Sequence, residues 1–114
     1  MPDCIFCRIA DKQVPSTIVH EDERCVAFQD ANPQAPHHYL VIPKAHVGNL
    51  ATLGAADEGL VGHLCTVAEG VARQQGFEGS GYRVVANVGA HGGESVNHLH
   101  LHVLGGRPLT WPPG

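Results

Sequence analysis

The sequence is poor in basic residues and contains no cluster of them. Its 114 residues include 7 Lys and Arg against 11 Asp and Glu, for a formal net charge of −4. Proteins that bind DNA or RNA carry a positive surface that neutralises phosphates. This charge balance therefore argues against a nucleic acid polymer as the partner and favours a small ligand.

Long apolar segments and secretion signals are also missing. No apolar run approaches the ~18 residues that a membrane-spanning helix needs. The N-terminus lacks the cationic stretch followed by an apolar block that marks a secretory signal. Of the four cysteines, Cys4 and Cys7 are too close in sequence for a disulfide to close a useful loop. We therefore expect a cytoplasmic protein with no membrane partner.

The sequence has no internal repeats and no linker-like segments, which predicts one domain over residues 1–114. Apolar residues at helical spacing predict one long helix over residues 56–75. β-prone segments predict strands at residues 16–20, 25–29, 38–42, 82–88 and 98–104. Strands on both sides of one helix, with connections short enough for hairpins, predict an α+β fold with an antiparallel sheet.

Histidine, by contrast, is abundant: the nine histidines outnumber Lys and Arg together. His98, His100 and His102 alternate with apolar residues, so on a strand the three imidazoles would share one face. Imidazole titrates near neutral pH and serves as a nucleophile, an acid or a metal ligand, so the row favours chemistry over a solvated surface. The pattern leaves two chemistries open, a three-histidine zinc centre and nucleophilic catalysis by one imidazole.

A glycine-rich segment at residues 87–95 directly precedes the histidine row. Its glycines allow backbone N–H groups to converge on an anion, and Asn87 and Ser95 add side-chain donors. The segment contains no Gly-Lys-Ser/Thr and no Gly-x-Gly-x-x-Gly, so it is neither a Walker loop nor a dinucleotide fingerprint. Such a loop by itself is more often a turn, but beside three imidazoles it indicates a phosphate-binding loop.

Cys4 and Cys7 form a single C-x-x-C pair, which has three interpretations. The pair could be a redox dithiol, two buried structural thiols, or half of a zinc site that two histidines complete. A redox pair is expected between a strand and a helix, and no predicted strand precedes these residues. We expect Cys25 and Cys65 to serve packing.

The segment His98–Leu104 has the pattern His-φ-His-φ-His-φ-φ, where φ is apolar, and resembles the signature of the histidine triad (HIT) superfamily. Segments that resemble its Hint branch lie at residues 28–30, 33–36, 40–44, 92–95 and 111–114. The resemblance covers nearly the whole chain. It implies a five-stranded antiparallel sheet with one long and one short helix, and a homodimer whose two sheets join.

The activity that the resemblance implies is hydrolysis of purine nucleoside 5′-phosphoramidates through a covalent nucleotidyl-histidine. By motif position, His100 is the implied nucleophile and His102 the group that contacts the phosphate and helps to protonate the leaving amine. The implied catalytic residues are His38, Ser95, His100 and His102. The implied nucleotide-binding residues are Phe6, Ile9, Phe28, Asp30, Asn87, Gly93, Ser95, His100, His102 and Trp111. Asp30 would accept hydrogen bonds from the ribose, and Trp111 would reach the active site of the partner copy.

Members with an N-terminal cysteine pair bind zinc through it and two histidines. The matching residues here are Cys4, Cys7, His46 and His98, which implies a structural zinc and no cofactor for catalysis. With His98 in a closed site, two imidazoles of the row remain, too few for a catalytic three-histidine zinc. Two alternatives stay open: a dinucleoside polyphosphate hydrolase, and a nucleotide-binding or interaction module whose hydrolysis is incidental.

Overall fold

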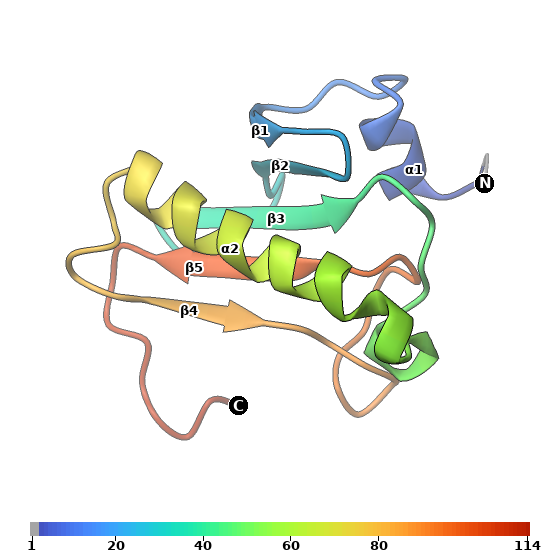
Figure 1. Cartoon of the computed structure of the whole chain (residues 1–114). Coiled ribbons are helices and arrows are strands. Elements are labelled where there is room, and N and C mark those ends of the chain that lie inside the picture. The colour runs from blue at the N-terminus through green and yellow to red at the C-terminus, as the bar shows by residue number, and fades with distance from the viewer. Residues whose placement is uncertain (1–2) are drawn as a thin grey trace.

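The computed structural model describes residues 3–114 and shows a five-stranded antiparallel sheet with a long helix across one face (Figure 1). The strands are β1 Ile18–Glu21, β2 Cys25–Gln29, β3 His37–Pro43, β4 Tyr82–Val85 and β5 Leu101–Gly105. The helices are α1 Ile5–Ala10 and α2 Glu58–Gln74, and the short 3-10 helices η1 Leu50–Thr52 and η2 Ala55–Asp57 precede α2. The strand order is β1-β2-β3-β5-β4. These observations confirm the predicted α+β fold with one long and one short helix.

No helix within residues 3–114 combines the length and the apolar character needed to cross a bilayer.

The strand that carries the histidine row is shorter than predicted. β5 begins at Leu101, so His98 and His100 lie in the irregular segment before it. β3 ends at Pro43, and the chain beyond it turns away, so the Leu99 N–H donates to the carbonyl oxygen of Val47 at 2.6 Å instead. The predicted strand at residues 82–88 likewise ends early, at Val85, where the chain enters the glycine-rich loop.

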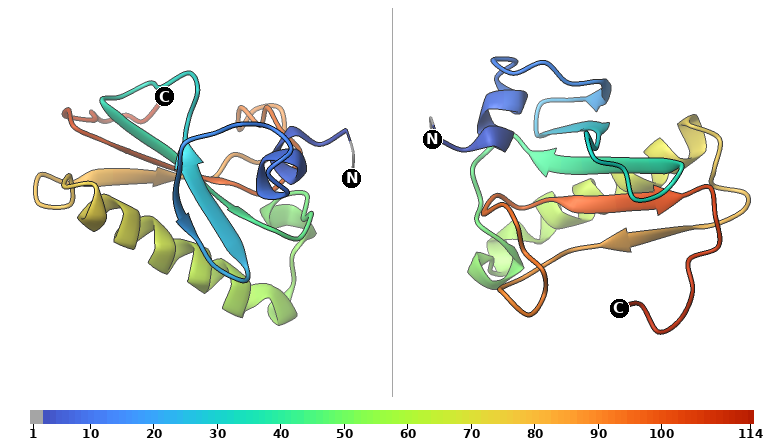
Figure 2. Two further views of the ribbon diagram at one scale, coloured as in Figure 1. Left: turned by 90° about the horizontal axis from the view of Figure 1, so that it is seen from above. Right: turned by 180° about the vertical axis from the view of Figure 1, so that it is seen from behind.

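The sheet buries apolar side chains on both faces. On one face, Cys25 and Ala27 of β2 pack with the buried side of α2. On the other face, Val26 and Phe28 of the same strand pack in a cluster with Phe6 of α1. Seen from behind, α1 lies at one end of this second face, away from α2 (Figure 2). The side-chain alternation along each strand therefore separates a helix-covered face from a face that is largely free of helices.

The alternation of the histidine row persists although the first part is not a strand. Leu99, Leu101 and Val103 belong to the cluster that packs against α2. The rings of His98 and His100 instead contact Phe6, with ring centroids 5.9 and 5.1 Å apart. The imidazoles therefore lie on the sheet face opposite α2.

A second group of histidines joins the β1–β2 turn to α2. His20 Nε2 and His63 Nε2 lie 2.8 and 2.6 Å from the same carboxylate oxygen of Asp22. Burial alone would raise the pKa of Asp22, but hydrogen bonds from His20, from the Arg24 N–H and from His63 hold it well below its usual range. These two histidines, which the sequence left without a role, therefore tether a hairpin to a helix.

Gly105, at the end of β5, leaves no room for a side chain. A Cβ atom there would lie 2.4 Å from Cδ2 of Phe77, whose ring is buried and stacked on His37 with centroids 4.5 Å apart. We expect Gly105→Ala to lower the free energy of unfolding by about 1–3 kcal/mol, measured by chemical denaturation. Gly62→Ala in α2 is the matched control, because a Cβ there meets nothing within 4 Å. Equal stability of the two variants would contradict the prediction.

Candidate active site and metal centre

His100 is held so that one ring nitrogen is free. Its Nδ1 lies 2.7 Å from the carbonyl oxygen of His98. A carbonyl oxygen only accepts, so Nδ1 must carry the proton and donate it. In the neutral imidazole, Nε2 then has an unprotonated lone pair. The ring is buried edge-on against Phe6, which fixes its orientation, so Nε2 can act as an oriented nucleophile.

His38 and His102 form a second pair of rings next to His100. Nε2 of His38 lies 2.8 Å from Nδ1 of His102, and the backbone N–H of Gln34 donates to Nδ1 of His38 at 3.0 Å. Because Nδ1 of His38 accepts, the proton of the neutral ring lies on Nε2 and points at His102. His102 then accepts at Nδ1 and carries its own proton on Nε2.

Both rings of this pair favour the neutral form. Burial, followed by the nearby imidazoles of His100 and His38, lowers the pKa of His102 to about 4. Burial also lowers the pKa of His38. The negative charge of Asp30 opposes both shifts. At pH 7 the protein without substrate therefore holds two neutral, hydrogen-bonded imidazoles beside the nucleophile.

Asp30 lies just past the end of β2, between this pair and a cavity. Its Oδ2 is 3.3 Å from Nε2 of His38, and its Oδ1 accepts the backbone N–H of Asn32 at 2.8 Å. The cavity has a volume of about 490 Å³ and is lined by Ile9, Phe28 and Asp30 together with residues 14–17. This volume is within the range of small-ligand sites, and apolar walls with one carboxylate suit a flat ring joined to a second group that carries hydroxyls.

The cavity separates the three residues predicted to surround the base. Ile9 and Phe28 line it while also belonging to the core cluster under α1. Phe6 does not line the cavity. Its ring packs in T-shaped geometry against the rings of Phe28 and His100, with centroid distances of 5.8 and 5.1 Å. Phe6 therefore packs against the ring of His100, the proposed nucleophile, and does not contact the cavity. Sequence reasoning did not single out residues 14–17, which also line the cavity because the chain before β1 lies beside the end of β2, where the Gln29 N–H donates to the carbonyl oxygen of Thr17 at 2.9 Å.

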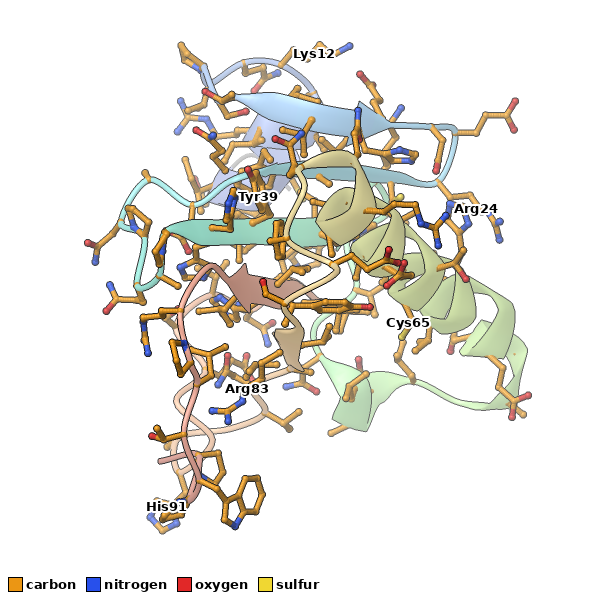
Figure 3. All side chains as sticks on the ribbon, turned by 90° about the vertical axis from the view of Figure 1, so that its left-hand side faces the viewer. Lys12, Arg24, Tyr39, Cys65, Arg83 and His91 are labelled. Atoms are coloured by element: carbon orange, nitrogen blue, oxygen red, sulfur yellow. The ribbon has the colours of Figure 1, made fainter. Side chains whose placement is uncertain are left out.

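Two predicted site residues, Ser95 and Trp111, make no hydrogen bond with His100 or His102 within the described residues of one copy of the chain. Ser95 is exposed and lines a separate depression of about 390 Å³ beside Cys4 and His46. Trp111, in the C-terminal stretch, is 82% exposed. Arg83 holds that stretch by donating from its guanidinium to the carbonyl oxygens of residues 109 and 110 at 2.9 and 2.8 Å. Figure 3 shows Arg83 beside this stretch, far from Lys12.

The glycine-rich loop is organised by Glu94, a residue that sequence reasoning missed. Its Oε1 accepts from the Gly89 N–H at 2.9 Å and from Asn49 Nδ2 at 2.8 Å, and its Oε2 accepts from Asn97 Nδ2 at 3.0 Å. The bonds from Asn97, Gly89 and Asn49 lower the pKa of Glu94. A lone carboxylate among glycines was the available signal, because the loop's N–H groups need an acceptor.

Asn87 and Gly93, the other predicted loop residues, lie where the loop turns. Asn87 donates from Nδ2 to the carbonyl oxygen of Gly92 at 2.6 Å. Gly93 has φ +76°, a conformation that favours glycine, and Asn87 Nδ2 is 3.7 Å from the place where its Cβ would be. The Asn87 amide therefore closes the loop, and it retains a second N–H for a ligand.

Four donor atoms from distant parts of the chain converge at one end of the sheet. Sγ of Cys4 and Cys7 and Nδ1 of His46 and His98 all lie within 4.8 Å of one another. The S–N distances are 3.3 Å for Cys4–His98, 3.3 Å for Cys7–His46 and 3.5 Å for Cys7–His98. A tetrahedral zinc with ordinary Zn–S and Zn–N bonds would hold such atoms ~3.6 Å apart. The spacing therefore fits zinc without rearrangement.

His98 is oriented for this task by its second ring nitrogen. Nε2 lies 2.9 Å from the carbonyl oxygen of Pro43, so Nε2 donates and Nδ1 keeps its lone pair for a metal. Burial lowers the pKa of His98, which favours the neutral ring that a metal needs. Cys4 caps the N-terminus of α1 and Cys7 lies one turn later, so both thiols face the same point. Two thiols and two imidazoles, with no open position among them, suit a structural zinc.

The comparisons with known proteins agree with this fold and site. Residues 3–108 match the family model described as "Scavenger mRNA decapping enzyme C-term binding". The chain is 49% identical over 112 residues to an uncharacterized HIT-like protein of Synechococcus elongatus, covering 98% of this chain and 97% of that protein. It is 52% identical over 113 residues to the 14 kDa zinc-binding protein of Zea mays, covering 96% of this chain and 87% of that protein.

A solved structure gives the same result. The crystal structure of a HIT family hydrolase from Legionella pneumophila superposes with a TM-score of 0.96 at 45% identity, covering 98% of this chain and all of that one. The five-stranded sheet and the three alternating histidines define a histidine triad protein. The chain belongs to the HIT family, which confirms the resemblance at that level.

Proposed function

We propose that this HIT family protein is a hydrolase that cleaves the P–N bond of purine nucleoside 5′-phosphoramidates. The observation that carries the proposal is the His100 ring, whose Nδ1 bond to a carbonyl oxygen leaves Nε2 unprotonated. The Legionella pneumophila relative, a HIT family hydrolase, supports hydrolysis as the reaction class. The resemblance to the Hint branch supports the nucleoside and the amine.

The reaction has two steps at the α-phosphorus. In the first, Nε2 of His100 forms a bond to phosphorus, the P–N bond breaks, and the amine leaves with an added proton. In the second, water attacks phosphorus, the P–Nε2 bond breaks, and the nucleoside monophosphate is released while the water loses a proton. His102, with its Nε2 proton, is the group placed beside the nucleophile to transfer these protons, and His38 sets its tautomer.

The remaining site residues bind and position the nucleotide. The cavity wall of Ile9 and Phe28 takes the base, and Asp30 takes the ribose hydroxyls. The loop with Asn87, Gly93 and Ser95 takes the phosphate oxygens, because positioning and charge stabilisation carry most of the catalysis in such a transfer.

We also propose that Cys4, Cys7, His46 and His98 hold a structural zinc. The Zea mays relative, which is named as a zinc-binding protein, supports this assignment together with the S–N spacing. Bound zinc would cross-link α1 to the segments after β3 and before β5, and so hold Phe6 under His100.

The proposed assembly is a homodimer in which edge strands pair and Trp111 reaches the partner copy. β4 is an edge strand of the sheet, and its Val84 is 42% exposed. Trp111 is more exposed still, although Arg83 keeps the stretch before it ordered. An exposed tryptophan on an anchored tail is suited to a contact with another molecule. Light scattering should give twice the mass of one chain.

Mass spectrometry of a quenched reaction tests the proposed function. Protein mixed with adenosine 5′-phosphoramidate and stopped in acid-free denaturant should carry an adenylyl group on His100. An adduct on another residue, or turnover without any adduct, would contradict the mechanism. Faster turnover of a diadenosine polyphosphate than of the phosphoramidate would move the protein to the neighbouring hydrolase branch, and no turnover of either would favour a binding module.

A further inference from the structure

We propose that Asp30 is the charge partner of the His38–His102 pair and lets that pair hold the proton that departs with the amine. In this role Asp30 acts as a positioning residue through His38, in addition to binding the ribose. The inference rests on the proposed function.

Asp30 is fixed against His38 by both its side chain and its backbone. Its Oδ2 lies 3.3 Å from Nε2 of His38, and its backbone N–H donates to the carbonyl oxygen of the same residue at 3.0 Å. Its Oδ1 is occupied by the Asn32 N–H. The His38 side chain is 4% exposed and that of Asp30 is 19% exposed. The carboxylate is therefore a charge held beside a buried ring, and it remains open to the cavity.

The reaction needs an acid that the neutral rings do not supply. His100 must stay neutral to attack, so the proton for the amine has to come from the other two imidazoles. A neutral His102 can release its Nε2 proton only if Nδ1 receives another proton from His38. A neutral His38 has one proton to give, and losing it would leave an anionic ring. The pair therefore needs one extra proton before the P–N bond breaks.

One extra proton makes the pair a buried cation, which is costly unless an anion compensates it. The titratable groups that face His102 are His100 and His38, which disfavour its protonation, and Asp30, which favours it. Asp30 thus contributes the protein's negative charge that compensates the protonated pair, and the phosphate of the substrate contributes a second negative charge. With Asp30, the protonated pair has no net charge.

The proton balance closes over one turnover. In the first step the pair gives its extra proton from His102 Nε2 to the departing amine. In the second step the attacking water returns a proton to His102 Nε2 as the P–Nε2 bond of His100 breaks. Product release returns this extra proton to solvent and leaves the neutral pair, which takes up one proton again when the next substrate brings its phosphate charge; over one turnover no reactant besides water is consumed.

Asp30→Asn separates this role from ribose binding, because asparagine keeps an acceptor oxygen and loses the charge. We expect kcat for an adenosine phosphoramidate of a basic alkylamine to fall by roughly 10- to 100-fold, and that for a nitroaniline to fall less than about 3-fold. A nitroaniline also leaves with an added proton, but it is a much weaker base than an alkylamine, so less proton transfer is needed when the P–N bond breaks and its rate depends less on the acid. The ratio of the two rates does not depend on how much of the variant is folded.

The pH profile gives a second readout. Activity that needs the protonated pair is lost as pH rises through the pKa of the pair. Removing the negative charge lowers that pKa, so the basic limb of the kcat profile should move to lower pH in Asp30→Asn. Asp11→Asn makes an equal charge change at an exposed residue after α1. It should leave unchanged both the ratio of the alkylamine and nitroaniline rates and the pH of the basic limb of the kcat profile.

The ribose contact is tested in the wild-type protein. A 2′,3′-dideoxyadenosine phosphoramidate removes the hydroxyls and leaves the carboxylate charge, so it should raise KM without changing the dependence on the amine. Equal losses of kcat for both amines in Asp30→Asn, with an unmoved basic limb, would overturn this inference and leave Asp30 as a ribose contact. Failure of wild-type protein to form the His100 adduct with the nitroaniline substrate would instead overturn the proposed function.

Discussion

Replacing His100 by asparagine is expected to lower the turnover of adenosine 5′-phosphoramidate by on the order of 10³-fold or more. Asparagine is close in size, and its side-chain N–H can still donate to the His98 carbonyl oxygen that now fixes Nδ1. It has no ring nitrogen with a free lone pair, so no covalent nucleotidyl intermediate can form. Steady-state rates with the same phosphoramidate and mass spectrometry of the quenched protein measure the two consequences.

The matched control for this variant is His20→Asn, which removes one hydrogen bond to Asp22 and no group of the site. We expect its turnover to stay near that of the wild type. Circular dichroism should show the same fold for both variants. If His100→Asn turned over at an unchanged rate, the nucleophile would have to be another group, and the proposed mechanism would be wrong.

Loss of the zinc ligand Cys7 is expected to have the largest effect on stability. A ligand that binds only the folded state stabilises it by ~4 kcal/mol when its free concentration is about 1,000 times Kd. At about 4 °C for each kcal/mol in a domain of this size, Cys7→Ser should lower Tm by roughly 15 °C. Metal analysis should show one zinc for each wild-type chain and little in the variant, because a serine hydroxyl is a poor zinc ligand.

Cys65→Ser is the matched control, because Cys65 is exposed on α2 and lies outside the four-donor cluster. It should retain the zinc and the Tm of the wild type. A chelator should lower the Tm of wild-type protein toward that of Cys7→Ser and leave the variant unchanged. Fresh wild-type protein without metal, or a Cys7→Ser variant with full zinc content, would contradict the assignment.

Chain-local patterns predicted most of the fold. The β2 prediction matches the observed Cys25–Gln29, and the long-helix prediction of residues 56–75 contains α2. The largest errors lie at the end of β4 and the start of β5, where strand length depends on the partner strand, and the bounds of β1 and β3 differ from the prediction by one or two residues. β5 stops pairing where β3 reaches Pro43, and a partner's end is not encoded within the segment itself.

The candidate site was partly predictable for the same reason. Three histidines in alternation with apolar residues must point away from the residues that pack against α2, and the structure keeps that separation even before β5 begins. Glu94 and residues 14–17 were missed, because their contribution depends on loops folding over one another. Ser95 was predicted as a side-chain donor of the glycine-rich loop and Trp111 from the family resemblance. In one copy of the chain Ser95 lines a separate depression and Trp111 is exposed.

The sequence by itself determined which faces the side chains occupy and which chemistry was available, since both follow from residue type and from a period of two along a strand. Only the tertiary structure decided where the protons lie. The tautomers of His98 and His38 are set by partners that other parts of the chain bring to them: Pro43 for His98, and Gln34 and Asp30 for His38. A ring nitrogen becomes a ligand, a nucleophile or a donor through the hydrogen bond made by the opposite nitrogen, and that bond exists only in the folded chain.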